Sequence, residues 1–296
     1  MKVLNHNLTQ WRARGELIEV MGRRLFVARA GSGPTLLLVH GYPTSSYDWH
    51  PVWNTLAKHF TLIAPDFLGM GFSDKPRNYP YGVQSHADLL ESVVKHCKVK
   101  RMHVMAHDLG VSVAQEMVAR RQIDALLAPI DAMVLLNGGV CPEAYQPRAI
   151  QRLLISPLGP WIGPRIPQRL FERTLRKLFG TFSQPTPQLL ADFWALVCHK
   201  GGREVTHLTG RFYIDRLLLR DRLVDPLVSG AVPVQLINGE ADPNSGRHMA
   251  DRYREVVPNA DVISLEHIGH WPQIEAPEAV LNATVAFFDR YSRSVG

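Results

Sequence analysis

Three polar residues that could perform nucleophilic chemistry follow short apolar runs at distant points of the sequence. Asp108 lies in the run MAHDLG, between an expected strand and an expected helix, where the small residues Ala106 and Gly110 allow the tight turn of a nucleophile elbow. Asp242 follows the apolar run 232–237, and His270 follows the run 261–265. This is the chain order of a nucleophile, an orienting acid and a base. An Asp at the position of Asp108 is also a common helix N-cap.

A fourth segment, His40-Gly41-Tyr42-Pro43, follows the apolar run TLLLV. If these turns meet at one edge of a sheet, backbone N–H groups of Tyr42 and Leu109 could together hold an oxyanion. An imidazole acts as a base near neutral pH when it is unprotonated and oriented, which is the task expected of Asp242 toward His270. Glu240 is an alternate acid, although the Asp-Pro context favours Asp242.

The elements that must position these residues follow from the hydrophobic pattern. Apolar runs without polar alternation predict buried strands at 35–39, 61–65, 101–105, 132–136, 232–237 and 261–265. Amphipathic stretches between them predict helices at 49–59, 86–97, 109–120, 247–256 and 277–291. A pair at 16–20 and 24–28 predicts an antiparallel hairpin at the sheet edge. The alternation indicates an α/β fold with a mostly parallel sheet covered by helices on both faces.

The strand–helix alternation stops between about residues 139 and 229. This stretch is rich in proline and contains apolar helical patterns at 170–179 and 189–197. We interpret residues 140–228 as a helical cap inserted after the sixth strand, with residues 1–139 and 229–296 forming the core domain.

Composition excludes several classes of protein. The 296 residues are 46% hydrophobic and 20% charged, which is typical of a globular protein. The sequence has a net charge of +6 but no long Lys/Arg block, so we interpret the charge as spread along the chain and predict no nucleic-acid partner. Three distant cysteines favour a reducing compartment, and the sequence has no stretch of about 18 apolar residues. These features predict a cytoplasmic protein with no membrane partner.

The motifs resemble those of a known family over nearly the whole chain. The runs HGYPTSSYDWHPVW, PDFLGMGFSDKP, HDLGVSVAQE and LNGG are similar to those of the α/β-hydrolase family, in its epoxide hydrolase and haloalkane dehalogenase branch. They are closer still to the mesoderm-specific transcript proteins. The resemblance implies an eight-stranded sheet, Asp108 as nucleophile, His270 as base, Asp242 as its acid, and an oxyanion hole at Tyr42 and Leu109.

An Asp nucleophile has chemistry of its own. A carboxylate attacks saturated carbon to form an alkyl ester, and His270 would then activate water against that ester. No metal or organic cofactor is required, and the remaining histidines lack the spacing of a zinc site. The expected partners are a small apolar, epoxide-like substrate and water, acting on a monomer or homodimer.

The candidate reactions differ in which side chain donates a proton or hydrogen bond to the leaving group. Tyr213 matches the family's second cap tyrosine and is expected to protonate an opening epoxide, while Tyr145 lies early in the cap for a second donor. Trp161 and Trp194 are further candidates in the cap. Related dehalogenases carry Trp or Arg directly after the nucleophile, where this chain has Leu109.

We also expect His40 and His107, which stand in the two active-site turns, to lie at the substrate site. Epoxide hydrolysis to a vicinal diol is therefore the leading prediction. The alternatives are haloalkane-type dehalogenation and a catalytically idle fold that binds a ligand or a protein partner.

Overall fold

A computed structural model describes residues 4–124 and 127–292 of the chain, and its centre is one eight-stranded sheet. The strands are β1 (Gly15–Val20), β2 (Arg23–Ala30), β3 (Thr35–Val39), β4 (Thr61–Pro65), β5 (Met102–Asp108), β6 (Ile130–Gly138), β7 (Val234–Gly239) and β8 (Asp261–Leu265). Their spatial order is β1-β2-β4-β3-β5-β6-β7-β8. The β1–β2 and β2–β4 pairs are antiparallel and all others are parallel. The predicted sheet and its edge hairpin are confirmed.

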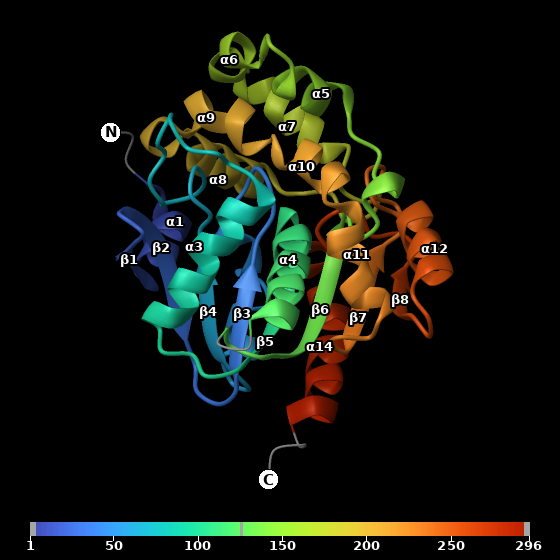
Figure 1. Cartoon of the computed structure of the whole chain (residues 1–296). Helices are drawn as coiled ribbons and strands as arrows, with labels where there is room; N and C mark the ends of the chain where they lie inside the picture. The colour runs from blue at the N-terminus through green and yellow to red at the C-terminus, as the bar shows by residue number, and fades with distance from the viewer. Residues whose placement is uncertain (1–3, 125–126, 293–296) are drawn as a thin grey trace.

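Helices cover both faces of this sheet, because its strands are apolar on both sides. In β3, Leu37 and Val39 belong to one hydrophobic cluster, while Leu36 and Leu38 belong to the other. The first face is covered by α3 (Val83–His96), α4 (Leu109–Ile123), α11 (Arg220–Val228) and α12 (Arg247–Val256). The second is covered by α1 (His6–Arg12) and α14 (Pro277–Ser292), which Figure 1 labels, and also by α2 (Trp53–Leu56).

The expected helix at 49–59 is wrong. The structure has a short 3-10 helix at Ser46–Trp49 and a separate single turn, α2. Pro51 lies between them, and proline lacks the backbone N–H that would continue the helical hydrogen bonding. The apolar spacing is real, since Trp49, Val52, Trp53 and Leu56 are all buried.

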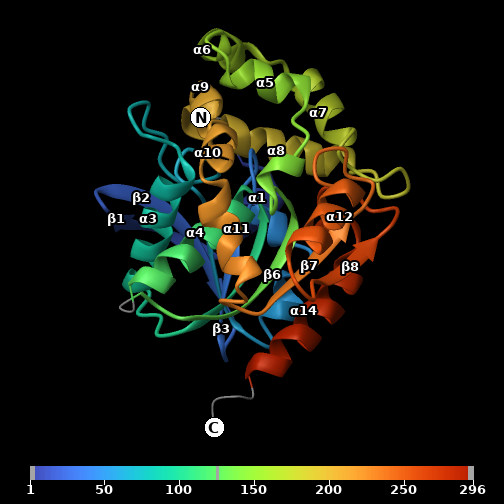
Figure 2. The ribbon, with the colours of Figure 1, turned by 45° about the vertical axis from the view of Figure 1, so that its right-hand side comes forward.

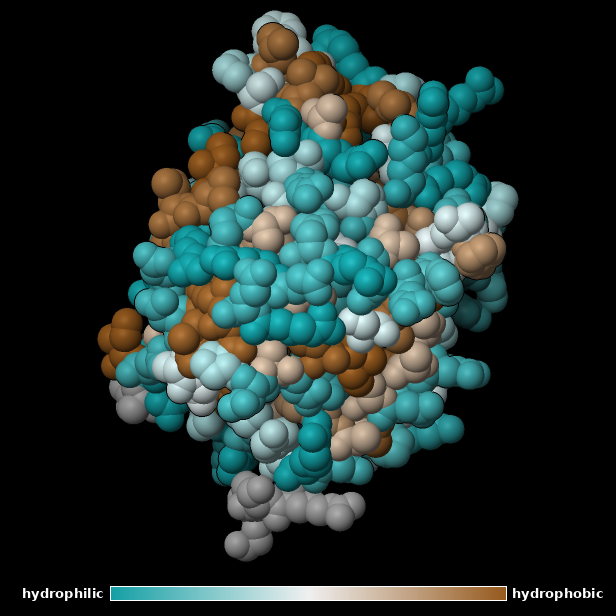
Figure 3. Space-filling model, turned by 90° about the vertical axis from the view of Figure 1, so that its right-hand side faces the viewer, coloured by the Kyte–Doolittle hydropathy of each residue, from teal (hydrophilic) through white to brown (hydrophobic). Residues whose placement is uncertain are grey.

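Six helices between β6 and β7 lie together above the carboxyl ends of the strands (Figures 1 and 2). They are α5 (Ala149–Ile155), α6 (Gly159–Ile162), α7 (Gln168–Arg176), α8 (Pro187–Cys198), α9 (Gly202–Thr209) and α10 (Phe212–Leu218). We call them the cap helices. Apolar side chains reach the surface at this end of the molecule (Figure 3), where Leu158 and Trp161 are exposed.

Two buried polar side chains tie the cap helices to the core. Asp192 of α8 accepts hydrogen bonds from the Tyr47 hydroxyl at 3.0 Å and from the Asn5 and Asn7 amides. Arg216 of α10 is fully buried and donates from Nε to the hydroxyl of Ser112 in α4 at 2.9 Å. Both contacts join segments more than 100 residues apart in the sequence.

Candidate active site

Asp108 occupies a strained turn between β5 and α4. Its φ of 48° and ψ of −109° lie outside the regions that L-residues favour, which costs of the order of 1–3 kcal/mol. The turn is possible because its neighbours are small. A Cβ on Gly41 would lie 2.7 Å from Asp108 Cβ, and one on Gly110 would lie 2.3 Å from the Val39 carbonyl oxygen. Such dihedrals are typical of a nucleophile elbow, and the Asp108 side chain makes no capping bond to any described residue of α4.

The two carboxylate oxygens of Asp108 have different surroundings. Oδ2 accepts a hydrogen bond from the backbone N–H of Tyr42 at 3.0 Å. Oδ1 is buried, has no hydrogen-bond partner among the described residues, and lies 3.9 Å from His270 Nε2. One oxygen is thus fixed by the backbone, and the other is left to face the imidazole.

His270 joins the two carboxylates. Its Nδ1–H donates to Asp242 Oδ2 at 2.7 Å. Burial on its own lowers the pKa of His270, but the carboxylates of Asp242 and Asp108 outweigh it and raise that pKa to about 9. Near neutral pH this pKa favours a protonated imidazole beside the ionised carboxylate of Asp242.

Asp242 is held in its ionised form by a ring of donors. Its carboxylate accepts hydrogen bonds from the Ser245 hydroxyl at 2.6 Å, the Asn244 backbone N–H at 2.8 Å and the Asn137 amide at 3.1 Å. Burial raises the pKa of Asp242, but His270 and these donors outweigh burial and lower it to about 2. Glu240 instead lies 2.5 Å from Arg247, and the carboxylate that contacts the His270 ring is that of Asp242.

His40 and His107 lie beneath the site rather than on the wall of the pocket. His107 Nε2–H donates to the backbone carbonyl of His270 at 2.7 Å, and its Nδ1 lies 3.8 Å from Asp48. His40 Nδ1–H donates to the Gly41 carbonyl, and its Nε2 accepts from the Phe67 N–H. Both imidazoles therefore brace the active-site turns, and neither is among the residues that line the pocket.

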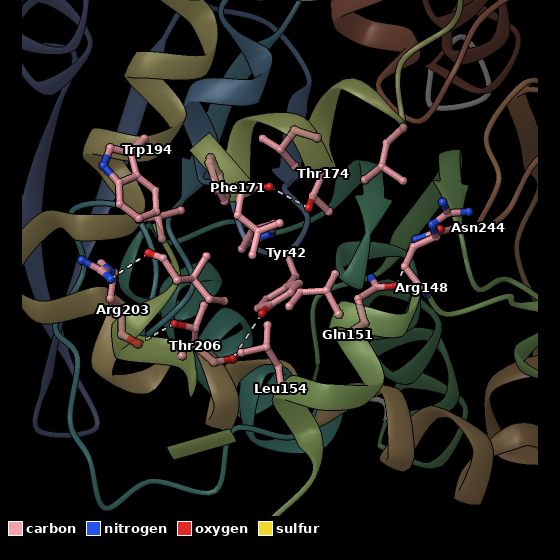
Figure 4. A pocket seen from close by; sticks show the side chains of 18 of the residues that line it. Tyr42, Arg148, Gln151, Leu154, Phe171, Thr174, Trp194, Arg203, Thr206 and Asn244 are labelled. Atoms are coloured by element: carbon pink, nitrogen blue, oxygen red, sulfur yellow. Dashed lines mark hydrogen bonds between the residues drawn. The ribbon is translucent and has the colours of Figure 1, made fainter. Parts of the chain in front are cut away.

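A mainly apolar pocket opens above Asp108 and His270, between the sheet and the cap helices (Figure 4). Its apolar wall is formed by Pro43, Ile150, Leu154, Gly163, Ile166, Leu170, Phe171, Leu175, Leu178, Trp194 and Val197. The polar and charged residues that line it are Tyr42, Asp108, Arg148, Gln151, Thr174, Arg203, Thr206, Asn244 and His270. This lining suits a substrate with a substantial apolar body.

The aromatic cap residues that we expected at the substrate site do not all line the pocket. Trp194 lines the pocket, whereas the Trp161 side chain is 68% exposed and lies outside it. Tyr145 and Tyr213 border a small recess beside the pocket, with ring centroids 5.7 Å apart. The buried Tyr145 hydroxyl accepts hydrogen bonds from the amides of Asn244 at 2.9 Å and Gln151 at 3.1 Å.

Sequence reasoning missed several polar residues that the structure brings to this site. Asn244 lines the pocket and holds both Asp242 and Tyr145. The guanidinium of Arg216 lies 4.8 Å from the centroid of the Tyr145 ring and donates weakly to the Asp108 carbonyl at 3.5 Å. Asn244, two residues after Asp242, could have been found from the sequence, but nothing in the local pattern marks Arg216.

Fold and site together define a hydrolase of the α/β fold. The chain belongs to the α/β-hydrolase family, since a sequence model of the alpha/beta hydrolase fold matches residues 34–277. It is similar to the mesoderm-specific transcript protein of Mus musculus, with 35% identity over 97% of this chain and 90% of the mouse protein. It is also similar to the LipZ protein of Mycobacterium tuberculosis, with 34% identity over 95% of this chain and 97% of that protein. The family resemblance expected from the sequence is confirmed.

Solved structures show the same fold. The epoxide hydrolase CorEH matches with a TM-score of 0.76 and 22% identity, over 93% of this chain and 98% of that one. The haloalkane dehalogenase DbeA from Bradyrhizobium elkani matches with a TM-score of 0.79 and 20% identity, over 94% and 98%. Within residues 4–124 and 127–292, none of the helices has the length and apolar character needed to cross a bilayer.

Proposed function

We propose that this hydrolase uses Asp108 as a nucleophile, forms an alkyl-enzyme ester and hydrolyses epoxides to vicinal diols. The observation that carries the proposal is the unequal environment of the Asp108 carboxylate. Oδ1 accepts no hydrogen bond from any residue that the structure describes and faces His270, while Oδ2 is fixed by the Tyr42 N–H. A carboxylate in this position attacks carbon through Oδ1, and Oδ2 becomes the carbonyl oxygen of the ester.

The same N–H then serves the second step. When water adds to the ester carbon of Asp108, negative charge develops on Oδ2, which already lies 3.0 Å from the Tyr42 nitrogen. The amide of Leu109, at the first turn of α4, is our second donor because the first N–H groups of a helix have no intrahelical acceptor. Collapse of the intermediate releases the product alcohol with the former Oδ1, and the oxygen of water stays in Asp108.

His270 changes its role between the two steps. While Asp108 is ionised, the raised pKa keeps the imidazole protonated, which makes it a poor base. Ester formation removes one of its two neighbouring negative charges, so the pKa falls and Nε2 becomes able to take a proton from water. The same proton returns to the departing alkoxide. Asp242 holds the ring through Nδ1 throughout.

An opening epoxide also needs a proton donor, for which we propose Tyr145 and Tyr213. The Tyr145 hydroxyl accepts two hydrogen bonds from Asn244 and Gln151, so its own proton is available to a third group. Tyr213 lies beside it and has no side-chain hydrogen bond among the described residues. A phenol that donates as the C–O bond breaks leaves the product hydroxyl neutral, and the resulting phenolate takes up, through solvent, the proton that His270 gives up once the ester has formed.

A trapping experiment tests the covalent step. His270→Gln removes the base but keeps Asp108, so incubation with styrene oxide should raise the intact protein mass by that of the whole substrate. Asp108→Ala is the control and should show no adduct. With 1-bromobutane, a dehalogenase would instead gain a butyl group and release bromide. Absence of an adduct across a broader epoxide panel contradicts the proposal and favours the ligand-binding alternative.

Within the part of the chain that the structure describes, Cys97 and Cys141 form no disulfide. Free cysteines persist in reducing compartments, and on this ground we propose that the protein acts in the cytoplasm.

A further inference from the structure

The excess of positive over negative charge is confined to one part of the chain. Residues 140–228 contain 13 basic residues (Lys and Arg) and 7 acidic residues (Asp and Glu). The remainder of the chain contains 20 basic and 20 acidic residues. The even spread expected from the sequence is therefore wrong, and the whole net charge of +6 lies in residues 140–219, which include the cap helices over the pocket, because residues 220–228 hold two charges of each sign. A positive field over a pocket favours the entry of negatively charged molecules.

The pocket itself carries the same imbalance. Two arginines, Arg148 and Arg203, are among its lining residues, and Asp108 is the one carboxylate among those described. Arg203 is already occupied, because it donates to the Pro164 and Ile166 carbonyls and lies 5.0 Å from the Trp194 ring centroid. The guanidinium of Arg148 has no hydrogen bond or ion pair among the described residues.

We propose that Arg148 binds the carboxylate of the substrate, and that the natural substrate is therefore an apolar epoxide that also bears a carboxylate. The inference rests on the proposed function for the epoxide part alone. A guanidinium offers paired N–H donors that match the two oxygens of a carboxylate. One free guanidinium suits a single negative charge, whereas a phosphate dianion would call for more than one unpaired cation.

The surroundings of Arg148 distinguish this end of the pocket from the rest. In Figure 4, Arg148 lies with Gln151 and Asn244 on one side, and Trp194 and Arg203 lie on the other. Gln151 accepts the Arg148 backbone N–H at 2.8 Å and so fixes the start of α5. Leucine, isoleucine and aromatic side chains fill the wall between the two sides. The pocket thus combines an apolar wall with one polar, cationic end, which complements an amphiphile.

Binding of decanoate and of decan-1-ol tests this inference without any chemistry at Asp108. The two probes have the same chain and differ in charge, and calorimetry gives the ratio of their affinities. A hydrogen-bonded charge pair contributes enough that Arg148→Gln should lower the decanoate-to-decanol ratio by about 10- to 100-fold. Arg148→Lys, which keeps the charge but loses the paired donors, should restore part of that ratio.

Arg152→Gln is the matched control. It removes the same charge from the same helix, one turn further on, and Arg152 is exposed and does not line the pocket. Its ratio should stay within about twofold of the parent value. Equal losses in the two variants would mean that the general field of the cap, and not Arg148, attracts the anion. An unchanged ratio in Arg148→Gln would place the carboxylate elsewhere, for example at His270. Either result overturns the inference.

Turnover then separates this inference from the proposed function. The parent protein should prefer 10,11-epoxyundecanoate over 10,11-epoxyundecan-1-ol in kcat/KM, and Arg148→Gln should reduce that preference by a similar factor. If neither epoxide is hydrolysed while decanoate still binds through Arg148, the epoxide reaction is wrong and the anion site stands. If both are hydrolysed with no preference for the acid, the anion site is wrong and the epoxide reaction stands.

Discussion

Neutralising Asp108 should lower the pKa of His270, and Asp108→Asn imitates the neutral ester that the proposed reaction forms. Oδ1 of Asp108 lies 3.9 Å from His270 Nε2. At that separation a unit charge contributes about 4 kcal/mol at an effective dielectric constant of 20, and about 1 kcal/mol at 80. Since 1.36 kcal/mol corresponds to a tenfold change in the equilibrium, the pKa should fall from about 9 to between about 6 and 8.

The assay is a titration of the His270 ring proton by NMR, with His270→Gln identifying the resonance among the 13 histidines. Intact-mass spectrometry must confirm that the Asp108→Asn change persists during the titration. The control is Asp48→Asn, because Asp48 lies near His107 and not beside His270 Nε2. This substitution should change the His270 pKa much less than Asp108→Asn does. A His270 pKa that stays near 9 in Asp108→Asn would refute the argument that ester formation turns the imidazole into a base.

Three further outcomes concern stability. The folded-state pKa of His270 is raised from 6.5 to about 9, so protonated His270 stabilises the fold by roughly 3 kcal/mol below pH 6.5. This stabilisation is lost as the pH rises from 6.5 to 9. The unfolding free energies of the parent and of His270→Gln should therefore converge between pH 6.5 and pH 9. Gly139→Ala would place a Cβ 2.2 Å from Arg216 Nη1, so we expect a loss of about 1–3 kcal/mol in urea denaturation, and an unchanged midpoint would show that Arg216 moves freely. Asp192→Ala should cost about 1–3 kcal/mol because it leaves the buried Tyr47 hydroxyl unpaired, and Tyr47→Phe in the same background should recover part of the loss.

The regular part of the fold was predictable because each strand is a short apolar run of its own. The strands at Thr35–Val39 and Thr61–Pro65 begin and end where the sequence places them. The helix expected at 49–59 failed because its apolar spacing is real but Pro51 interrupts the backbone. Apolar periodicity reports which side chains are buried and not whether the chain between them is helical.

The candidate site also contains residues that could be predicted from the sequence and residues that could not. Asp108 ends a strand, and Asp242 and His270 each follow one. Because the carboxyl ends of parallel strands meet at one edge of the sheet, their convergence could be expected from order alone. Trp161 and Trp194 come from the cap helices, where no repeating unit fixes which face looks inward. One lines the pocket and the other faces solvent. The role of Arg216 could not be predicted from the sequence, because the residues it contacts, Ser112 and Tyr145, are distant along the chain.

The buried position of Arg216 limits how this protein can be rebuilt. Its guanidinium lies against the backbone of Gly139, bonds to Ser112 in the core, and packs 4.8 and 4.9 Å from the Tyr145 and Phe212 ring centroids. An isolated cation in such a place is costly, so the helix that brings it and the surface that receives it must be exchanged together. Grafting the cap helices onto a related core that lacks a small residue at the position of Gly139 and a hydroxyl at that of Ser112 should give an unstable chimera. The cap and core of this protein should therefore melt as one cooperative unit.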